Sequence, residues 1–341
     1  MRQLKNVLYI TTPETYLSCE GESIVVQAPN KNHVHIPSHN LESVVQFGYP
    51  GMSPATMALC AQQGICVSFL YPSGRFLARV EGPQKGSILL RRKQYEIYRN
   101  DEICSRLASR FVTAKILNCR TVLMRGIRDC ACDIESMHDT CVHLKSLASK
   151  AFSQTSLSVL RGIEGEAAQL YFNQINNLLT DGVEQLRMHG RSRRPPMDRF
   201  NCLLSFCYTL LTHECRSACE TVGLDPQAGY LHTDRPGRPG LALDLMEELR
   251  PIFSDRMCIS LVNRRQVKVD DFDVKPNGAV LLKEETRSIL IDNWQKRKQE
   301  QIAHPFLEEK IPFGLLPYAQ AMLLARFIRG DIDDYPGFIW R

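Results

Sequence analysis

The chain has 341 residues, of which 44% are hydrophobic and 23% charged, and its formal net charge at pH 7 is +5. This composition is typical of a globular protein long enough for two domains, and the modest net charge does not by itself indicate a nucleic-acid partner. No stretch approaches the ~20 uninterrupted apolar residues of a membrane span, and the N-terminus lacks a hydrophobic signal region, so we expect a cytoplasmic protein. The thirteen cysteines are an odd number, and many fall in apolar helical patterns, which favours reduced buried thiols over a disulfide framework.

The first 84 residues predict a small β-rich domain. One helix interrupts it at residues 53–64, where Ser53 is the expected N-cap, Pro54 the first helical residue and Gly64 the end. Short β-rich runs alternate with turns rich in Gly, Pro, Asn and Ser, and we expect strands at 6–10, 23–28, 33–37, 43–48, 65–71 and 75–80.

Beyond the boundary at residues 81–87, long periodic apolar segments predict helices. They cover roughly residues 87–126, 134–151, 156–180, 200–222, 241–253, 284–302 and 317–329. Residues 267–282 are strand-like and predict a local hairpin with KPNG as its turn. The sequence therefore predicts an α+β protein of two domains, a β-sandwich-like domain at 1–84 and a mostly α-helical domain at 85–341.

One carboxylate stands in the apolar stripe of the helix expected at 156–180. Glu164 falls among its apolar residues, whereas Glu166 points the opposite way. Because a buried, unpaired carboxylate costs several kcal/mol, Glu164 must bind a cation, coordinate a metal or be protonated. Gly162 and Gly165 weaken this helix, and they indicate close approach of another backbone or a ligand beside Glu164. A metal ligand and a buried ion pair, with Arg161 as the candidate cation, both remain open.

A histidine and an acid cluster flank a loop rich in Pro, Gly and Arg. The run HTDRPGRPGLALDLMEELR begins at His232 and continues into an amphipathic helix that carries Asp244, Glu247 and Glu248. The loop lets the chain fold back, so His232 could meet these acids. Glu164, His232 and Glu247 make a set of two carboxylates and an imidazole, which suits magnesium or manganese and leaves positions for phosphate oxygens. A plain solvated helix face is the competing interpretation of this stretch.

Positive charge is concentrated between these candidate ligands. The segment 187–201 is rich in arginine, and two further arginines lie in the loop that follows His232. An arginine cluster beside a metal site suits a phosphodiester backbone, although a basic turn is often only solvated. We assign DNA binding to Arg161, Arg187, Arg193, Arg194, Arg235 and Arg238.

Three motifs together resemble a known family. They are RGIEGEAAQLYF, RRPPMDRFNCLLSFCYTLL and GLDPQAGYLHTDRPGRPGLALDLMEELRP, and they are similar to the CRISPR adaptation integrase, the universal first-numbered Cas protein. The resemblance extends over nearly the whole chain. The sequences of the three motifs are similar to those of the type I-C branch of the family. It implies that Glu164, His232 and Glu247 are the catalytic metal ligands, with Mg²⁺ or Mn²⁺ as the ion.

The resemblance also assigns supporting residues. It implies that Asp244 supports the metal site and that Asn201 lies in a second shell near the DNA path. Many family members have Asp at the position of Glu247, so the neighbouring Glu248 could substitute as the ligand.

The resemblance further implies a homodimer that dimerises through the β domain, with two such dimers flanking a dimer of a small companion Cas protein. Its implied activity joins the 3′-OH ends of captured double-stranded DNA to the first CRISPR repeat beside the leader, in the cytoplasm of a prokaryote, and cleaves branched DNA at the same site. The competing hypothesis is a non-catalytic DNA-binding assembly subunit, in which Glu164, His232 and Glu247 form only a structural polar cluster.

Overall fold

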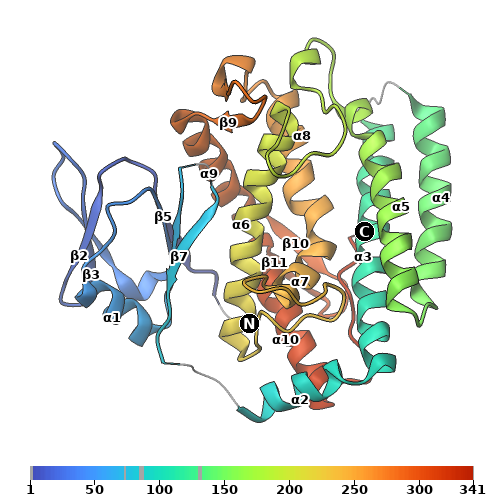
Figure 1. Cartoon of the computed structure of the whole chain (residues 1–341), viewed down its shortest axis with the longest axis horizontal. Helices are drawn as coiled ribbons and strands as arrows, with labels where there is room; N and C mark the ends of the chain where they lie inside the picture. The colour runs from blue at the N-terminus through green and yellow to red at the C-terminus, as the bar shows by residue number, and fades with distance from the viewer. Residues whose placement is uncertain (1–2, 73, 84–87, 130–132, 341) are drawn as a thin grey trace. The chain divides into compact units, whose positions relative to one another are not determined.

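The structure is a computed structural model that describes residues 3–72, 74–83, 88–129 and 133–340 (Figure 1). The chain divides into two compact units, one made of Met1–Lys85 with Leu282–Asp292 and the other of Gly86–Leu281 with Asn293–Arg341. A β-rich N-terminal region is followed by a mostly helical region, which confirms the predicted fold class.

Two sheets form the β-rich unit. The first is mixed, with β1, β5 and β6 parallel and β7 antiparallel, and the second is an antiparallel meander. In order across each sheet, the strands are β1 (Asn6–Ile10), β5 (Leu41–Phe47), β6 (Cys66–Leu70) and β7 (Phe76–Val80), then β2 (Tyr16–Glu20), β3 (Ser23–Gln27) and β4 (Val34–Pro37). Strand β2 was not predicted, because the run SCEGES reads as a turn. In the structure the turn is confined to two residues after Glu20, and Gly21 supplies the positive φ of 56° that it needs.

Helix α1 (Pro54–Gln63) has the predicted ends. The side chain of Ser53 accepts a hydrogen bond from the backbone N–H of Thr56, and Gly64 ends the helix with a φ of 72°. The core of this unit includes Leu17, Ile24 and Val44, which are fully buried.

The observed units differ from the predicted boundaries in one segment. Residues Leu282–Asp292, which contain the first half of α9 (Glu284–Gln299), belong with the β-rich unit. Arg287 makes this contact specific, because its Nη1 donates to the carbonyl oxygen of Pro72 at 2.7 Å. A single boundary near residue 84 misses a segment that returns about two hundred positions later.

The helical unit contains the remaining elements. Its helices are α2 (Ile88–Tyr98), α3 (Asp101–Arg128), α4 (Ile134–Phe152), α5 (Leu157–Asn173), α6 (Arg199–Val222), α7 (Gly240–Arg250), α8 (Arg256–Asn263), the second half of α9, and α10 (Leu316–Arg329). Short strands form two hairpins, β8 (Phe272–Val274) with β9 (Val280–Leu282) and β10 (Gln301–His304) with β11 (Glu309–Pro312). Single helical turns are η1 (Ser38–Asn40) in the β-rich unit, and η2 (Ile175–Leu178), η3 (Glu184–Leu186), η4 (Pro251–Asp255), η5 (Val269–Asp271) and η6 (Phe313–Leu315).

Several predicted helices are shorter than expected. The single helix expected at 87–126 is two, because the Asn100 side chain accepts from the N–H of Ile103 and starts α3 afresh. The helix expected at 241–253 gives way to a π-helical turn at Pro251, whose ring nitrogen has no proton for the α-helical hydrogen bond. The hairpin at 267–282 is confirmed, whereas α8 and the hairpin of β10 and β11 were not predicted.

Helix α3 is central to the helical unit. It packs against α4, α5 and α7, while α6 packs against α7 and α10 (Figure 1). This arrangement places α5 and α7 against the same long helix. In the described ranges, no helix is both long and apolar enough to cross a membrane.

Candidate active site

Glu164 of α5 is held by a lysine from the central helix. The Lys115 ammonium of α3 forms an ion pair with Glu164 Oε1, and the lysine side chain is only 7% exposed. A cation partner was one of the predicted alternatives for Glu164, but Arg161 as that cation was wrong. The Nε and Nη2 atoms of Arg161 donate instead to the backbone carbonyl oxygen of Leu231, at 2.9 and 2.8 Å.

The two glycines beside Glu164 face open space. A Cβ placed on Gly162 or Gly165 would meet no atom within 4 Å, so the expected approach of another backbone is wrong. The Glu164 side chain itself is 27% exposed, so it is partly accessible to solvent. The space over α5 is therefore available to a ligand.

His232 is fixed by the carboxylate of Asp244. The buried Asp244 accepts hydrogen bonds from the backbone N–H groups of Tyr230 (2.5 Å), Leu231 (3.0 Å) and His232 (3.1 Å). Its Oδ1 also lies 2.6 Å from His232 Nδ1. Since a carboxylate only accepts, Nδ1 carries the proton and Nε2 of a neutral ring keeps its lone pair. The free nitrogen of His232 is therefore Nε2.

The chain folds back at this point because two glycines meet. A Cβ on Gly229 would lie 2.5 Å from the carbonyl carbon of Gly240, and one on Gly240 would lie 2.7 Å from the carbonyl oxygen of Gln227. Side chains at either position would separate the segment that precedes His232 from the start of α7. This close approach brings His232 to Asp244, as the loop composition had predicted.

Glu247 joins the other two predicted residues. Its Oε1 lies 3.7 Å from His232 Nε2 and 2.9 Å from Arg250 Nη1, and its Oε2 lies 2.7 Å from Lys115 Nζ. Burial alone would raise the pKa of Glu247, but the charges of Arg250 and Lys115 lower it to about 2. Burial likewise acts to lower the pKa of Lys115, and Glu247 and Glu164 outweigh it to raise that pKa. The site thus contains an ionised Glu247 carboxylate, with the Lys115 ammonium between it and Glu164.

The donor set fits a hard divalent cation in its chemistry. Among the residues that the structure describes, no three His, Cys, Asp or Glu side chains are arranged as a metal cluster. However, the carboxylates of Glu164 and Glu247 already flank a cation, which is Lys115 Nζ. In addition, Glu247 Oε2 is buried without a hydrogen-bond partner. Carboxylate oxygens and an imidazole are ligands that Mg²⁺ and Mn²⁺ accept, so Glu164, His232 Nε2 and Glu247 could hold such an ion.

Glu248 points away from this set. Its Oε1 accepts from Tyr335 Oη at 2.6 Å and Gln320 Nε2 at 3.0 Å, and its Oε2 accepts from the N–H of Phe338 at 2.7 Å. Burial raises its pKa to about 7 in spite of these hydrogen bonds. The expectation that Glu248 could substitute for Glu247 is wrong, because its carboxylate anchors the C-terminal segment.

Asn201 lies at the start of α6, where it organises the basic segment. The fully buried side chain accepts from Arg191 Nη1 at 2.6 Å and donates to the carbonyl oxygen of Gly190 at 2.7 Å. Its contacts are thus with residues 190–201. It shapes the arginine-rich turn, and in the described part of the chain its side-chain hydrogen bonds stay within that turn.

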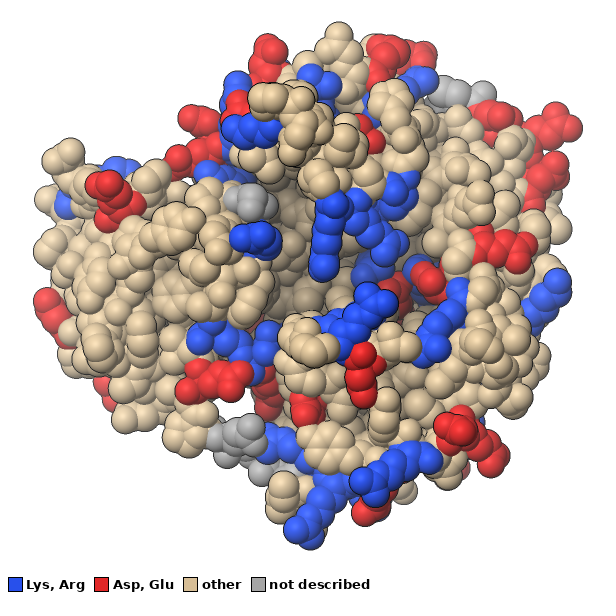
Figure 2. Space-filling model, in the orientation of Figure 1, with Lys and Arg blue, Asp and Glu red and all other residues tan. Residues whose placement is uncertain are grey.

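The predicted DNA-binding arginines fall near the site to different degrees. Arg193 lines a narrow pocket that also contains Lys115 and Arg250. Burial lowers the pKa of Arg238, and the neighbouring charges of Arg235 and Arg194 lower it further. Arg187 is only half-buried, and its Nε has no hydrogen-bond partner. Figure 2 shows Lys and Arg side chains gathered over the helical unit, with acidic side chains among them.

Two charged residues of the site were missed from sequence. Lys115 stands in the run RFVTAKILNC, where a lysine within a buried helical stripe carries the same signal that singled out Glu164. Arg250 follows Glu247 by three residues, the spacing at which helical side chains meet.

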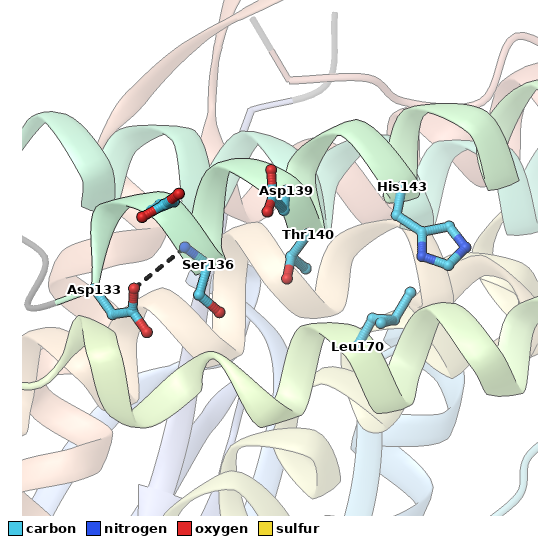
Figure 3. A pocket seen from close by; sticks show the side chains of 7 residues that line it. Asp133, Ser136, Asp139, Thr140, His143 and Leu170 are labelled. Atoms are coloured by element: carbon cyan, nitrogen blue, oxygen red, sulfur yellow. Dashed lines mark hydrogen bonds between the residues drawn. The ribbon is translucent and has the colours of Figure 1, made fainter.

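Another hollow of the described surface lies away from this site. It measures about 490 Å³ and is formed between α4 and α5, with Asp133, Glu135, Ser136, Asp139, Thr140, His143 and Leu170 as its lining (Figure 3). None of the three predicted site residues lines it. Because it is a shallow acidic groove, it does not suit a phosphodiester backbone.

Comparison with known proteins identifies the family of the chain. The family model described as CRISPR associated protein Cas1 matches residues 8–296. The CRISPR-associated endonuclease Cas1 1 of Chlorobaculum tepidum is 48% identical over the whole length of both chains. A CAS1 protein from Thermotoga maritima superposes with a TM-score of 0.83 at 26% identity, covering 95% of this chain and 97% of that chain. A casposase bound to integration product has the same fold, with a TM-score of 0.83 at 19% identity over 98% of this chain and 93% of that chain. The chain belongs to the Cas1 family of CRISPR-associated proteins.

Proposed function

We propose that this chain is a divalent-metal-dependent DNA endonuclease and integrase of CRISPR adaptation. The observation that carries the proposal is the convergence at Glu247, which meets His232 from the loop before α7 and, through Lys115, Glu164 from α5. These segments are separated by up to 83 positions in the sequence, so their meeting is a property of the fold. The name of the Chlorobaculum relative, an endonuclease, supports the same activity.

Glu164, His232 Nε2 and Glu247 would hold the ion, Mg²⁺ or Mn²⁺. When bound, it supplies positive charge to the attacked phosphate and to the leaving oxygen. The protein orients the ligands: Asp244 retains the proton on His232 Nδ1 and so directs Nε2 toward Glu247. His232 acts as a ligand rather than as a general base.

Arginines near the site would hold the DNA strands. Arg193 borders the narrow pocket beside Lys115, and Arg194, Arg235 and Arg238 lie close enough to one another to interact electrostatically. Arginine binds phosphate through paired N–H donors, which suits this role. The open space over Gly162 and Gly165 would let a strand approach Glu164.

The substrates we propose are double-stranded captured DNA with free 3′-OH ends, the CRISPR leader and repeat, and branched DNA. We further propose a homodimer joined through residues 1–84, a small companion Cas protein as the second partner, and membership of the type I-C branch. The fold shared with a casposase bound to integration product is consistent with strand joining.

One observation favours a second candidate, the non-catalytic assembly subunit. Lys115 and Arg250 already compensate the carboxylates of the site, as they would in a structural polar cluster. The two candidates differ in their dependence on a divalent ion.

The test is the joining of a short labelled duplex with free 3′-OH ends to a plasmid that carries a leader and repeat, with the companion protein present. Wild type, Glu164→Ala and His232→Ala would be compared with and without Mg²⁺ or Mn²⁺. Glu166→Ala is the matched control, because Glu166 lies two residues away on the opposite face of α5 and pairs with His143 at 3.1 Å outside the site.

Metal-dependent joining that Glu164→Ala and His232→Ala abolish, and that Glu166→Ala retains, supports the integrase. DNA binding that survives all three substitutions shows that the chemistry, and not the complex, was lost. Joining that is indifferent to metal and to both site substitutions refutes the proposal in favour of the assembly subunit.

A further inference from the structure

We propose that Lys115 Nζ occupies the position that a divalent ion takes between Glu164 and Glu247, so that Lys115 competes with the metal and must withdraw when the site is loaded. This inference rests on the proposed metal site. It assigns Lys115 as a positioning residue that controls metal loading.

The first support is the location of the ammonium group. Lys115 projects from the core of α3 with only 5% of the residue exposed, and Nζ pairs with both glutamates. A metal ion bound to the same two carboxylates would lie ~2.0–2.1 Å from their oxygens, in the volume that Nζ now fills. Two cations cannot share that volume, because their atoms would overlap and their charges repel each other.

The second support is that the two cations at Glu247, Arg250 and Lys115, are fixed by different contacts. Arg250 binds Oε1 at 2.9 Å, and its guanidinium also lies over the ring of Tyr208, 4.9 Å from the centroid. Lys115 faces Oε2 at 2.7 Å and also pairs with Glu164, so its single ammonium group is shared between two carboxylates. Such an ammonium acts on each carboxylate as a compact point charge, which another cation can replace.

The third support is a place for the lysine to go. The narrow pocket beside the site is lined by Lys115 and by Asp255, a buried carboxyl that accepts from Tyr208 Oη at 2.7 Å. In the withdrawn position that we propose, the lysine side chain turns from the glutamates toward Asp255, which would give the ammonium a negative partner.

The test measures Mn²⁺ binding to the purified full chain by electron paramagnetic resonance of the free ion. The variant is Lys115→Met, which keeps the length of the side chain and removes its charge. Because a competing unit charge is lost at the binding position, we expect Mn²⁺ to bind at least about tenfold more tightly than in the wild type.

The chain provides a matched control in Lys298. This lysine is 1% exposed and pairs with Glu214 Oε1 at 2.7 Å, so Lys298→Met also removes a buried charge, at another place. We expect it to lower the midpoint of thermal unfolding and to leave the Mn²⁺ affinity within about twofold of the wild type. Equal tightening in both variants would contradict a local competition at Glu164 and Glu247.

Binding by Lys115→Met that is unchanged or weaker than wild type overturns the inference, because Lys115 would then organise the carboxylates for the ion. Should Lys115→Met fail to fold, Asp255→Asn replaces it. That variant removes the negative partner of the withdrawn lysine and keeps an acceptor for Tyr208, and weaker Mn²⁺ binding is expected. Unchanged binding by Asp255→Asn overturns the withdrawal.

Failure of this inference is distinguishable from failure of the proposed function. If wild type binds Mn²⁺ and joins DNA with it, but Lys115→Met does not bind more tightly, only the competition by Lys115 is refuted. If neither wild type nor Lys115→Met binds Mn²⁺ at millimolar concentration, the proposed metal site fails together with it.

Discussion

Replacing Asp244 by Asn isolates the carboxylate that orients His232. The side chain is fully buried and accepts from three backbone N–H groups and from His232 Nδ1. An asparagine retains one acceptor oxygen, and its amide nitrogen would face N–H groups in place of the other. At least two of the four contacts must therefore be lost.

The expected cost follows from those contacts. A hydrogen bond to a charged acceptor contributes about 1.5–3 kcal/mol, so Asp244→Asn should lower the free energy of unfolding by about 3–6 kcal/mol. Asp331→Asn is the control, because Asp331 is 42% exposed and pairs with Arg329 at the surface. Its removal should cost less than about 1 kcal/mol.

The assay is urea unfolding followed by tryptophan fluorescence. The only tryptophans of the chain, Trp294 and Trp340, both belong to the helical unit, so the signal reports the unit that contains Asp244. If Asp244→Asn unfolds within about 1 kcal/mol of wild type, the carboxylate does not hold the backbone of residues 230–232. The assigned protonation of His232 would then lose its basis.

Three further predictions concern the C-terminal anchor and the DNA path. Burial raises the folded-state pKa of Glu248 to about 7 from an ordinary 4.5, so between these pH values the Glu248 carboxyl is protonated in the folded chain and ionised in the unfolded chain. The free energy of unfolding should therefore fall as pH rises from about 4.5 to 7, and Glu248→Gln should flatten this trend in thermal unfolding. Asn118→Ala removes hydrogen bonds to the carbonyl oxygens of Glu248 and Phe338, and it should cost about 2–4 kcal/mol in urea unfolding; a loss below about 1 kcal/mol would contradict the role of this amide. Arg194→Ala and Arg235→Ala should each weaken DNA binding alike for unrelated sequences and reduce the slope of log K against log salt by about 0.9; an unchanged slope in fluorescence anisotropy would remove that arginine from the DNA path.

The predictable part of the fold is the part with local signals. Helix α1 was predicted to its ends because Ser53, Pro54 and Gly64 each have a local backbone role. The start of α3 was missed because one capping asparagine, Asn100, interrupts an apolar period that continues on both sides. The segment Leu282–Asp292 was placed in the helical domain because its packing against the β-rich unit depends on contacts with distant residues.

The candidate site was likewise predictable only in part. The meeting of Glu164, His232 and Glu247 was expected from three motifs, and the structure brings them together. Lys115 and Arg250 were missed because the acidic residues were interpreted as metal ligands. The cations that neutralise them in the structure were therefore not sought in the sequence. Which of two adjacent glutamates faces the site depends on the register of α7, and the acid spacing alone left Glu248 open.

The most direct test of the proposed site compares these two neighbouring glutamates. Glu247→Gln and Glu248→Gln make the same chemical change one residue apart, and both carboxylates are buried. Metal-dependent cleavage of branched DNA would be measured for both variants, with circular dichroism to verify folding. The account predicts that Glu247→Gln abolishes cleavage and that Glu248→Gln retains it. Cleavage that persists in folded Glu247→Gln, or is lost in folded Glu248→Gln, would contradict the assignment of the site.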